Sequence, residues 1–361
     1  MPETVIPGPA DAGPPAAPAV AQAPAPAARA SDEVLGAEAR TGPGIERQRL
    51  PWQAKFAALA LIWGSSFLLM KLGLRWFSPI QIATARIVLG ALTVVVLLHL
   101  VGGRLPRSWH VWRHLLVVAV FLTSLPFVLF PLGEERVSSA LAGIGNATTP
   151  IATVVATMAL LPADRLPVRK LAAIGVGFLG VVVIAQPWQA DGQPDVLGFG
   201  LTLVAGASYG IGWTWVRKYL AKADLGGLQL PAALLVVASG QMLVVLLVWW
   251  SLHRSSHPLP WSPAVEATGD WAAPVLSLLA LGVLGTGLAY LLQFDVVRAV
   301  GQQVGSLVTY LIPVVSVVLG YVLLHERLGM WQGVGAVLVL AAAVFVTRPD
   351  RSPDAGVGRT R

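Results

Sequence analysis

The chain contains no cysteine among its 361 residues. Disulfide bridges, thiolate metal ligands and thiol nucleophiles are therefore excluded. Charge is also scarce, because Asp, Glu, Lys and Arg make up 12% of the residues, about half the fraction found in average soluble proteins. So little charge favours lipid rather than water as the solvent for most of the chain.

Long apolar runs take the place of charge. From about Trp52 to Thr347 polar residues occur mainly in short breaks, and the stretches 314–324 and 334–346 carry no charge at all. A helix needs about 20 apolar residues to cross a hydrocarbon core of about 30 Å. We therefore predict an all-α integral membrane protein with the lipid bilayer as its partner. The net charge of +7 then fits loops that meet anionic lipid headgroups, and no nucleic-acid partner is expected.

Proline, glycine and polar breaks divide the apolar region into ten predicted helices. Their ranges are 55–75, 79–101, 112–132, 137–161, 168–186, 196–216, 228–250, 271–294, 301–324 and 331–347. Lys and Arg collect on the cytoplasmic side of membrane proteins. With both termini inside, 18 of these residues are cytoplasmic and 5 are external. We expect a multi-pass protein of the bacterial plasma (inner) membrane with cytoplasmic termini.

Both ends of the chain have a different composition. Residues 1–50 are rich in proline and alanine, and residues 348–361 are short and polar. Such segments bury too little apolar surface to offset the entropy lost on ordering. We predict two disordered cytoplasmic tails.

The apolar region contains an internal repeat. Ile-Ala-Thr-Val-Val follows Pro150 and Val-Val-Ser-Val-Val follows Pro313, and one glycine- and alanine-rich helix comes after each. Residues 54–186 and 194–347 are thus two predicted five-helix units. Because five is odd, the second unit enters the membrane with the opposite polarity. Inverted repeats are typical of secondary transporters, whose binding sites lie near the midplane between the repeats.

Several motifs resemble those of the EamA family of the drug/metabolite transporter superfamily. They are Ile62-Trp63-Gly64-Ser65-Ser66-Phe67, the Arg86 of Ala83-Thr84-Ala85-Arg86, Asn146-Ala147-Thr148-Thr149-Pro150, and the segment from Pro313 to His325-Glu326-Arg327-Leu328-Gly329. The resemblance covers about residues 54–347 in two copies. It implies ten helices, cytoplasmic termini, and export or exchange of small metabolites, amino-acid-like compounds or drugs. The chain departs from the family pattern in having Asp164 near an expected glutamate, and its second half lacks a counterpart of Arg86.

Arg86 is the most informative charge. It lies seven residues past Pro79, roughly 10 Å along the second predicted helix at ~1.5 Å per residue. A charge at that depth costs several kcal/mol unless it is paired or hydrated. Arg86 either faces a cavity and meets an anionic substrate group, or it snorkels outward or caps carbonyls of a broken helix.

Other polar and aromatic residues fall inside predicted helices. Asn146, Thr148 and Thr149 precede Pro150, and they either satisfy the carbonyl freed by this proline or line a site. Trp63 and Tyr209 occupy equivalent places in the two repeats, where aromatic residues serve either packing or a cavity wall. The predicted substrate-binding set is Trp63, Ser66, Arg86, Asn146, Thr149, Tyr209, Trp213, Tyr290 and Tyr310.

The remaining motifs argue against other chemistries. Gly175-x-Gly177-x-x-Gly180 lies inside an apolar helix, so we interpret it as close helix packing rather than a dinucleotide site. No histidine pair has metal-ligand spacing, and we expect no metal, cofactor or catalytic residue. The main prediction is a secondary transporter of a small molecule, acting as a monomer or homodimer. The alternatives are a membrane-embedded enzyme such as a transferase and, with less support from the repeat, a channel or receptor.

No acidic residue falls well inside a predicted membrane span, and this bears on how transport is coupled to energy. A proton-coupled carrier often uses an acid buried in the membrane. The acids closest to the predicted spans are Glu134, Glu135, Asp295 and Glu326, and we expect all four to be hydrated loop or interface residues. Facilitated diffusion or solute exchange is therefore predicted, rather than proton antiport through a buried acid.

Overall fold

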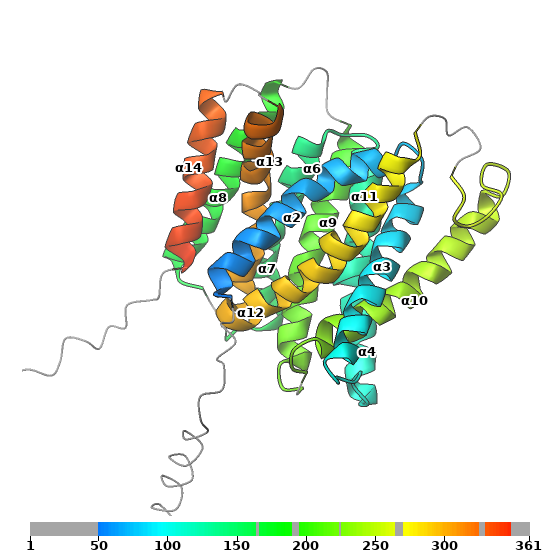
Figure 1. Cartoon of the computed structure of the whole chain (residues 1–361). Helices are drawn as coiled ribbons and strands as arrows, with labels where there is room; N and C mark the ends of the chain where they lie inside the picture. Colours follow the sequence, from blue (N-terminus) through cyan, green and yellow to red (C-terminus); the bar gives the residue numbers. More distant parts are fainter. Residues whose placement is uncertain are drawn as a thin grey trace, which may run out of the picture. The chain divides into compact units, whose positions relative to one another are not determined.

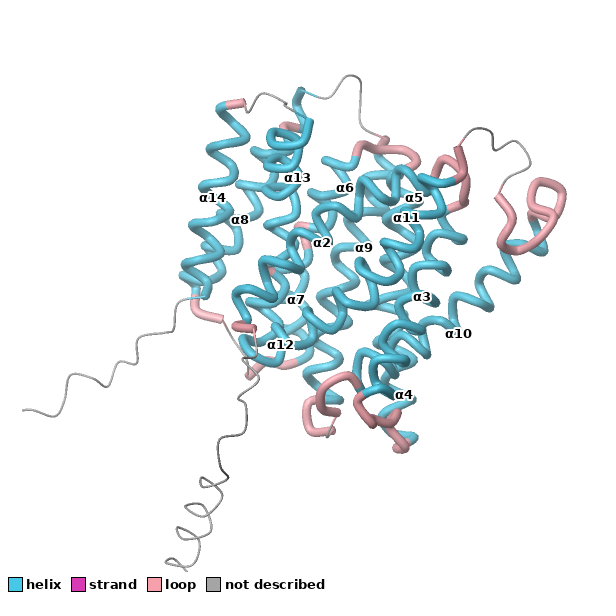
Figure 2. Tube along the Cα trace, viewed as in Figure 1, coloured by secondary structure: helices cyan, strands magenta, loops and turns pink. Residues whose placement is uncertain are grey.

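The computed structural model describes residues 50–163, 166–189, 195–223, 225–263, 270–324 and 329–347. These residues form helices joined by short connections, and no strand occurs among them (Figures 1 and 2). The two predicted tails, except Leu50, lie outside the described residues, as do Asp164 and Glu326.

The first half of the chain contains seven α-helical segments: α2 (Trp52–Gly73), α3 (Pro79–Leu100), α4 (Trp109–Ala119), α5 (Leu125–Glu134), α6 (Ser139–Asn146), α7 (Thr149–Leu160) and α8 (Val168–Ala185). The second half contains α9 (Val196–Trp215), α10 (Gln229–Leu252), α11 (Ala272–Gly282), α12 (Ala289–Ser306), α13 (Val308–Leu324) and α14 (Met330–Thr347). Wider π-helical turns η2 (Val120–Ser124), η4 (Val216–Leu220) and η5 (Val283–Leu288) extend α4, α9 and α11, and a short 3-10 turn, η3 (Pro187–Gln189), follows α8.

Eight helical segments of the described chain are long and apolar enough to cross a membrane. They correspond to the first eight predicted helices, although the eighth continues to Ser306 instead of ending near residue 294. This segment bends at Gly301, whose φ of +80° is readily adopted only by glycine. The last two predicted spans correspond to α13 and the shorter apolar helix α14. The count of ten therefore stays a prediction.

Local signals place the helix starts. Ser78 accepts a hydrogen bond from the Gln81 backbone and the Gln81 side chain accepts one from the Ser78 backbone, so a reciprocal cap begins α3. Pro79 follows as the first helical residue, where its missing N–H is not needed. Asp195 caps α9 by accepting a hydrogen bond from the Gly198 backbone at 2.6 Å.

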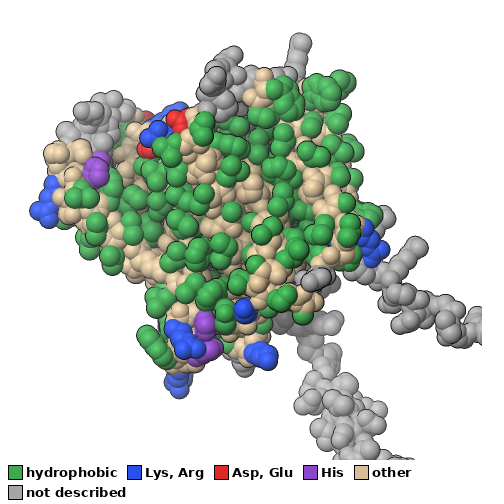
Figure 3. Space-filling view, turned by 180° about the vertical axis from the view of Figure 1, so that it is seen from behind, with side chains coloured by type: hydrophobic (Ala, Val, Ile, Leu, Met, Phe, Trp, Pro, Cys, Tyr) green, Lys and Arg blue, Asp and Glu red, His purple; other side chains and the backbone are tan. Residues whose placement is uncertain are grey.

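The outside of the helix bundle is apolar. Leu68, Leu92, Val155, Val244 and Val337 come from different helices, and each is more than half exposed. Figure 3 shows hydrophobic side chains over most of one face, with Lys and Arg gathered mainly near its edges. Exposed leucine and valine on this scale fit lipid as the surrounding solvent.

The two halves pack into each other. Helix α2 of the first half contacts α11, α12 and α13, whereas α9 of the second half contacts α5, α6 and α7. Glycine permits the closest approaches: a Cβ on Gly210 would lie 2.5 Å from backbone atoms of Ala152 and Thr153. The predicted packing role of the Gly175 motif is confirmed at Gly177 and Gly180, but Gly175 faces open space.

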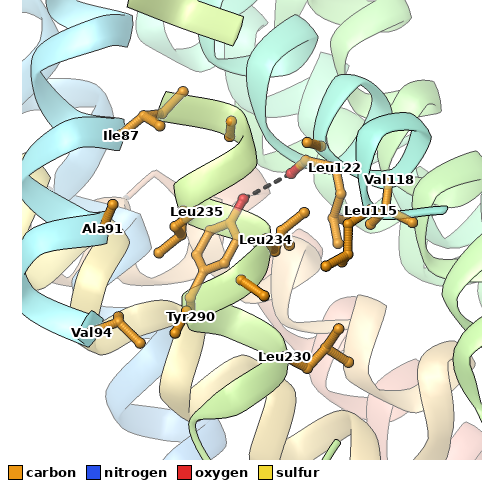
Figure 4. Close-up of a cluster of buried hydrophobic side chains, with 14 of the residues drawn as sticks. Ile87, Ala91, Val94, Leu115, Val118, Leu122, Leu230, Leu234, Leu235 and Tyr290 are labelled. Atoms are coloured by element: carbon orange, nitrogen blue, oxygen red, sulfur yellow. Dashed lines mark hydrogen bonds between the residues drawn. The ribbon is translucent and has the colours of Figure 1, made fainter. Parts of the chain in front are cut away.

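An apolar cluster packs α3, α4 and α10 together. Ile87, Ala91 and Val94 of α3 face Leu230, Leu234 and Leu235 of α10 and the α4 side chains Leu115 and Val118 (Figure 4). Tyr290 of α12 enters this cluster, and its hydroxyl donates to the Leu122 carbonyl at 2.8 Å. The cluster thereby holds α12 against η2.

Two ends of the bundle are distinguished below. The proximal end carries the start of α2 and the end of α14, and the distal end carries the α2–α3 turn and the α5–α6 turn (Figure 1). At the proximal end Lys55 of α2 and Asp295 of α12 form an ion pair of 2.7 Å, which Arg298 joins.

Candidate functional site

A cavity inside the bundle brings together eight of the nine candidate residues. Its lining includes Trp63, Ser66, Arg86, Asn146, Thr149, Tyr209, Trp213 and Tyr290, with Phe67, Met70, Leu122, Phe127, Phe130, Gln293, Ser306, Val308, Thr309 and Ile312. These residues come from both halves of the chain, through α2, α3, η2, α5, α6 and α7 on one side and α9, α12 and α13 on the other.

The cavity is small in this conformation. The centre of a water-sized sphere reaches about 60 Å³ of it, and one water needs about 10–15 Å³ by this measure. About four to six waters therefore fit in the cavity.

Arg86 is buried at the cavity wall, with only 5% of the residue exposed. Its Nε donates to the Thr286 hydroxyl at 3.2 Å, and its guanidinium carbon lies 4.0 Å from the centre of the Phe127 ring. Thr286 in turn donates to the Leu281 carbonyl across the wide turn of η5. Within the described residues no carboxylate comes within 4 Å of Arg86. The side chain thus neither snorkels to the surface nor caps a broken helix.

Aromatic rings form much of the remaining wall. The Trp63 indole donates to the Gly285 carbonyl at 3.1 Å, which fixes the ring against η5. Tyr209 stacks on Phe130 with 6.2 Å between ring centres. Tyr290 is held by the Leu122 carbonyl and by the Thr123 hydroxyl at 3.1 Å. These rings are oriented by backbone and aromatic contacts, so the apolar part of the wall is preformed.

Two amide oxygens at the cavity lack partners. Asn146 and Gln293 are both buried, and Asn146 Oδ1 and Gln293 Oε1 accept no hydrogen bond. Thr149, by contrast, donates to the carbonyls of Asn146 and Gly206 at 2.7 and 3.0 Å. It therefore satisfies backbone groups next to the break before Pro150, as one of the two interpretations of this segment required. A buried unpartnered oxygen is costly, and a ligand donor can satisfy it.

Tyr310 lies outside the cavity, so its predicted place in the lining is wrong. The side chain is fully buried and its hydroxyl donates to the Ile174 carbonyl of α8 at 2.9 Å. The neighbouring Thr309 does line the cavity. Successive helical residues point about 100° apart, because 3.6 residues complete a turn. Tyr310 therefore points toward α8, whereas the adjacent Thr309 points into the cavity.

Several lining residues lie outside the predicted set. Gln293 is on the same helix face as Tyr290, three residues later, and was left out because it falls near the predicted end of its helix. Phe127 and Phe130 form another pair three apart, next to Pro126 in an interrupted helix. Nothing in the composition separates these phenylalanines from those that face other helices.

The acidic residue Glu134 is buried, which contradicts the expectation that the acids near the membrane spans are all hydrated. Glu134, predicted to be hydrated, is fully buried, whereas Glu135 is exposed and Asp295 is paired with Lys55 and Arg298. Glu134 closes the last turn of α5, and this turn packs inward against α9 and the end of α2. In the part of the chain that the structure describes, no three His, Asp or Glu residues gather in a group that could hold a metal ion.

Comparison with known proteins gives the family. The model of the EamA-like transporter family matches residues 51–186 and 196–348. The chain belongs to the EamA-like transporter family. As an EamA protein with several apolar membrane-crossing segments, it is a multi-pass membrane protein of a transporter family.

Individual relatives agree with the family. An uncharacterized transporter of Archaeoglobus fulgidus is 28% identical over 81% of this EamA chain and 99% of its own length. The uncharacterized inner membrane transporter YedA of Escherichia coli is 24% identical over 83% and 92%. One solved crystal structure matches with a TM-score of 0.60 over 82% of this chain and 96% of its own, at 18% identity, which supports the fold alone.

Proposed function

We propose that this EamA protein is a secondary transporter that exports or exchanges a small organic metabolite carrying an acidic group. The observation that carries the proposal is Arg86, a buried guanidinium at a cavity wall. A hydroxyl, a sulfur and an aromatic ring contact it, and among the described residues no carboxylate lies within 4 Å of it. A buried cation without a counter-charge is unfavourable. An anionic substrate group supplies that charge, and the fork of the guanidinium suits a carboxylate.

The rest of the cavity favours an amino-acid-like molecule. Asn146 and Gln293 offer unpartnered oxygens to the N–H donors of an ammonium group. The rings of Trp63, Tyr209 and Tyr290 offer apolar surface to a side chain. A substrate with a carboxylate, an amino group and an apolar body makes use of all three features.

Reciprocal packing supports two inverted repeats in such a carrier. Helix α2 contacts α11, α12 and α13, which make up the third and fourth predicted spans of the second half. Likewise, α9 contacts α5, α6 and α7, which lie in the third and fourth predicted spans of the first half. A cavity between such halves can open to alternate sides when one half rocks against the other. In this proposal both termini are cytoplasmic, the proximal end faces the cytoplasm, and the protein acts as a monomer or homodimer.

A ligand screen on the purified protein tests the substrate class. Thermal unfolding is measured with amino acids of aliphatic and aromatic side chains, with carboxylic acids of the same carbon skeleton that lack the amino group, and with the matching amino-acid amides. We expect stabilisation by amino acids, weaker stabilisation by the simple acids, and none by the amides. Stabilisation by amides equal to that by amino acids would contradict a role for a carboxylate.

Variants of Arg86 connect the ligand to the site. Hydrogen bonds to charged groups contribute about 1.5–3 kcal/mol, so Arg86→Gln should weaken binding about tenfold to hundredfold, and Arg86→Lys less. Because Arg86 makes no ion pair in the empty protein, Arg86→Gln should not lower the melting temperature of the empty protein. Arg75→Gln is the matched control, since Arg75 is exposed in the turn that follows α2. A lower melting temperature of empty Arg86→Gln with unchanged ligand affinity would identify a structural role instead.

A further inference from the structure

Glu134 is the charged group whose position the proposed site leaves unexplained. It is fully buried at the end of α5, one helical turn beyond the cavity-lining Phe130. One carboxyl oxygen accepts a hydrogen bond from the Ser139 hydroxyl of α6 at 2.8 Å, and the other oxygen has no partner. An acid in a hydrated loop would be exposed to water, so the burial of Glu134 requires another explanation.

Three chain segments meet around this carboxyl at the distal end. The ammonium of Lys71, in the last turn of α2, donates to the main-chain carbonyls of Glu134 and Val137. Lys71 follows the cavity-lining Met70 directly. These hydrogen bonds join the end of α2 to the α5–α6 turn next to the distal part of the cavity lining.

The setting suits a neutral carboxyl better than a carboxylate. A buried ion needs charged or multiple polar partners, and its burial otherwise costs several kcal/mol. Lys71 uses hydrogen bonds on carbonyls and makes no ion pair with the carboxyl oxygens. The titratable or charged groups of the surrounding segments are Lys71 on α2, Arg86 on α3, Glu135 and Arg136 after Glu134, and Asp195 and Tyr209 on α9. Of these, Arg136 pairs with Asp195 at 3.5 Å.

We propose that Glu134 is a proton-binding site and that loss of its proton opens the distal side of the cavity. In the closed state the carboxyl keeps its proton. When the O–H bond breaks, the proton passes to water at the distal face and the electron pair stays on the carboxylate. The carboxylate then requires water, because Ser139 supplies only one donor. Water enters between α2, α5 and α6 and separates them.

This inference rests on the proposed function in one respect, since only a carrier has to open its cavity to one side. It replaces the sequence-based expectation that no buried acid takes part in coupling. In the orientation proposed above, which makes the distal end external, a proton held there links opening to the pH outside the cell.

Thiol labelling tests the proposal without a known substrate. The chain has no cysteine, so a single Ser66→Cys in the cavity reports its accessibility to a membrane-impermeant thiol reagent added outside intact cells. Ser66 donates its hydrogen bond to the Ile62 carbonyl of its own helix, which makes the exchange mild. Ser255→Cys, in the exposed loop after α10, gives the reference rate at each pH and checks that the distal end is external.

The expected result is that the relative labelling rate of the Ser66→Cys protein rises with external pH. Adding Glu134→Gln to this protein should keep the rate low at every pH, because an amide cannot ionise. Glu135→Gln is the matched control, an exposed acid one residue away, and should keep the rise. Ser139→Ala should shift the rise to higher pH, because it removes the one donor to the carboxylate.

Two results would overturn the proposal: a pH profile with Glu134→Gln equal to that of the Ser66→Cys protein alone, or a Ser66→Cys protein whose rate does not change with pH. If the Glu134→Gln variant does not fold, Ser139→Ala decides, and an unshifted profile would count against a proton site. Ligand binding through Arg86 is measured separately by thermal unfolding. Failure of one proposal is therefore distinguishable from failure of the other.

Discussion

At the scale of single residues, the proposed function depends on which side chains face the cavity. Arg86 could be predicted because an arginine deep in an apolar helix needs a reason to be there. The inward side of α13 could not be predicted, since Thr309 and Tyr310 are adjacent and both are polar. The burial of Glu134 was missed for a related reason, because a helix end in the sequence does not reveal whether the next segment covers it.

The Tyr310→Phe variant tests whether Tyr310 stabilises the fold without contacting the ligand. The hydroxyl donates to the Ile174 carbonyl inside α8, and the substitution removes this one hydrogen bond, which contributes about 0.5–1.5 kcal/mol. We expect a lower melting temperature of the detergent-purified protein with unchanged ligand affinity. An affinity loss as large as that of Arg86→Gln would return Tyr310 to the binding site.

At the scale of helices, hydropathy and the proline and glycine breaks predicted the positions of most helices. They did not predict which residues of neighbouring helices are in contact. The π-helical turns η2 and η5 carry Thr123 and Thr286, which orient Tyr290 and Arg86. No sequence signal marked these turns. The kink at Gly301 likewise depends on one glycine among several, and only the packed structure shows which glycine has a positive φ.

The contact of α9 with α7 gives a prediction at this scale. Gly210→Ala places a Cβ against backbone atoms of Ala152 and Thr153, and such overpacking costs about 1–3 kcal/mol. We expect a reduced melting temperature and a lower yield of monodisperse protein. Gly200→Ala on the same helix is the control, because nothing lies within 4 Å of its added Cβ. That variant should match or exceed the parent, since alanine favours helix over glycine; equal losses in both variants would refute the close contact.

At the scale of the whole described bundle, the sequence predicted a membrane protein of the EamA type with two related halves. The cavity arises because each half supplies its first helix to the other, which joins Arg86 and Asn146 to Tyr209 and Gln293. Contacts of this kind depend on residues far apart in the sequence, such as Trp63 and Gly285. Patterns within single helices carry no information about such pairs. Eight of the candidate residues lie at the cavity, but their arrangement around it could not be predicted.

The proposed function requires that this cavity carry a small organic acid across the membrane. The most direct measurement is exchange in liposomes that contain the purified protein and an internal store of the most stabilising ligand from the thermal screen. We predict uptake of labelled external ligand by the parent protein and by Arg75→Gln, and little or none by Arg86→Gln. A parent protein that binds the ligand but never exchanges it, or an Arg86→Gln variant that exchanges it at the parent rate, would contradict the proposed function.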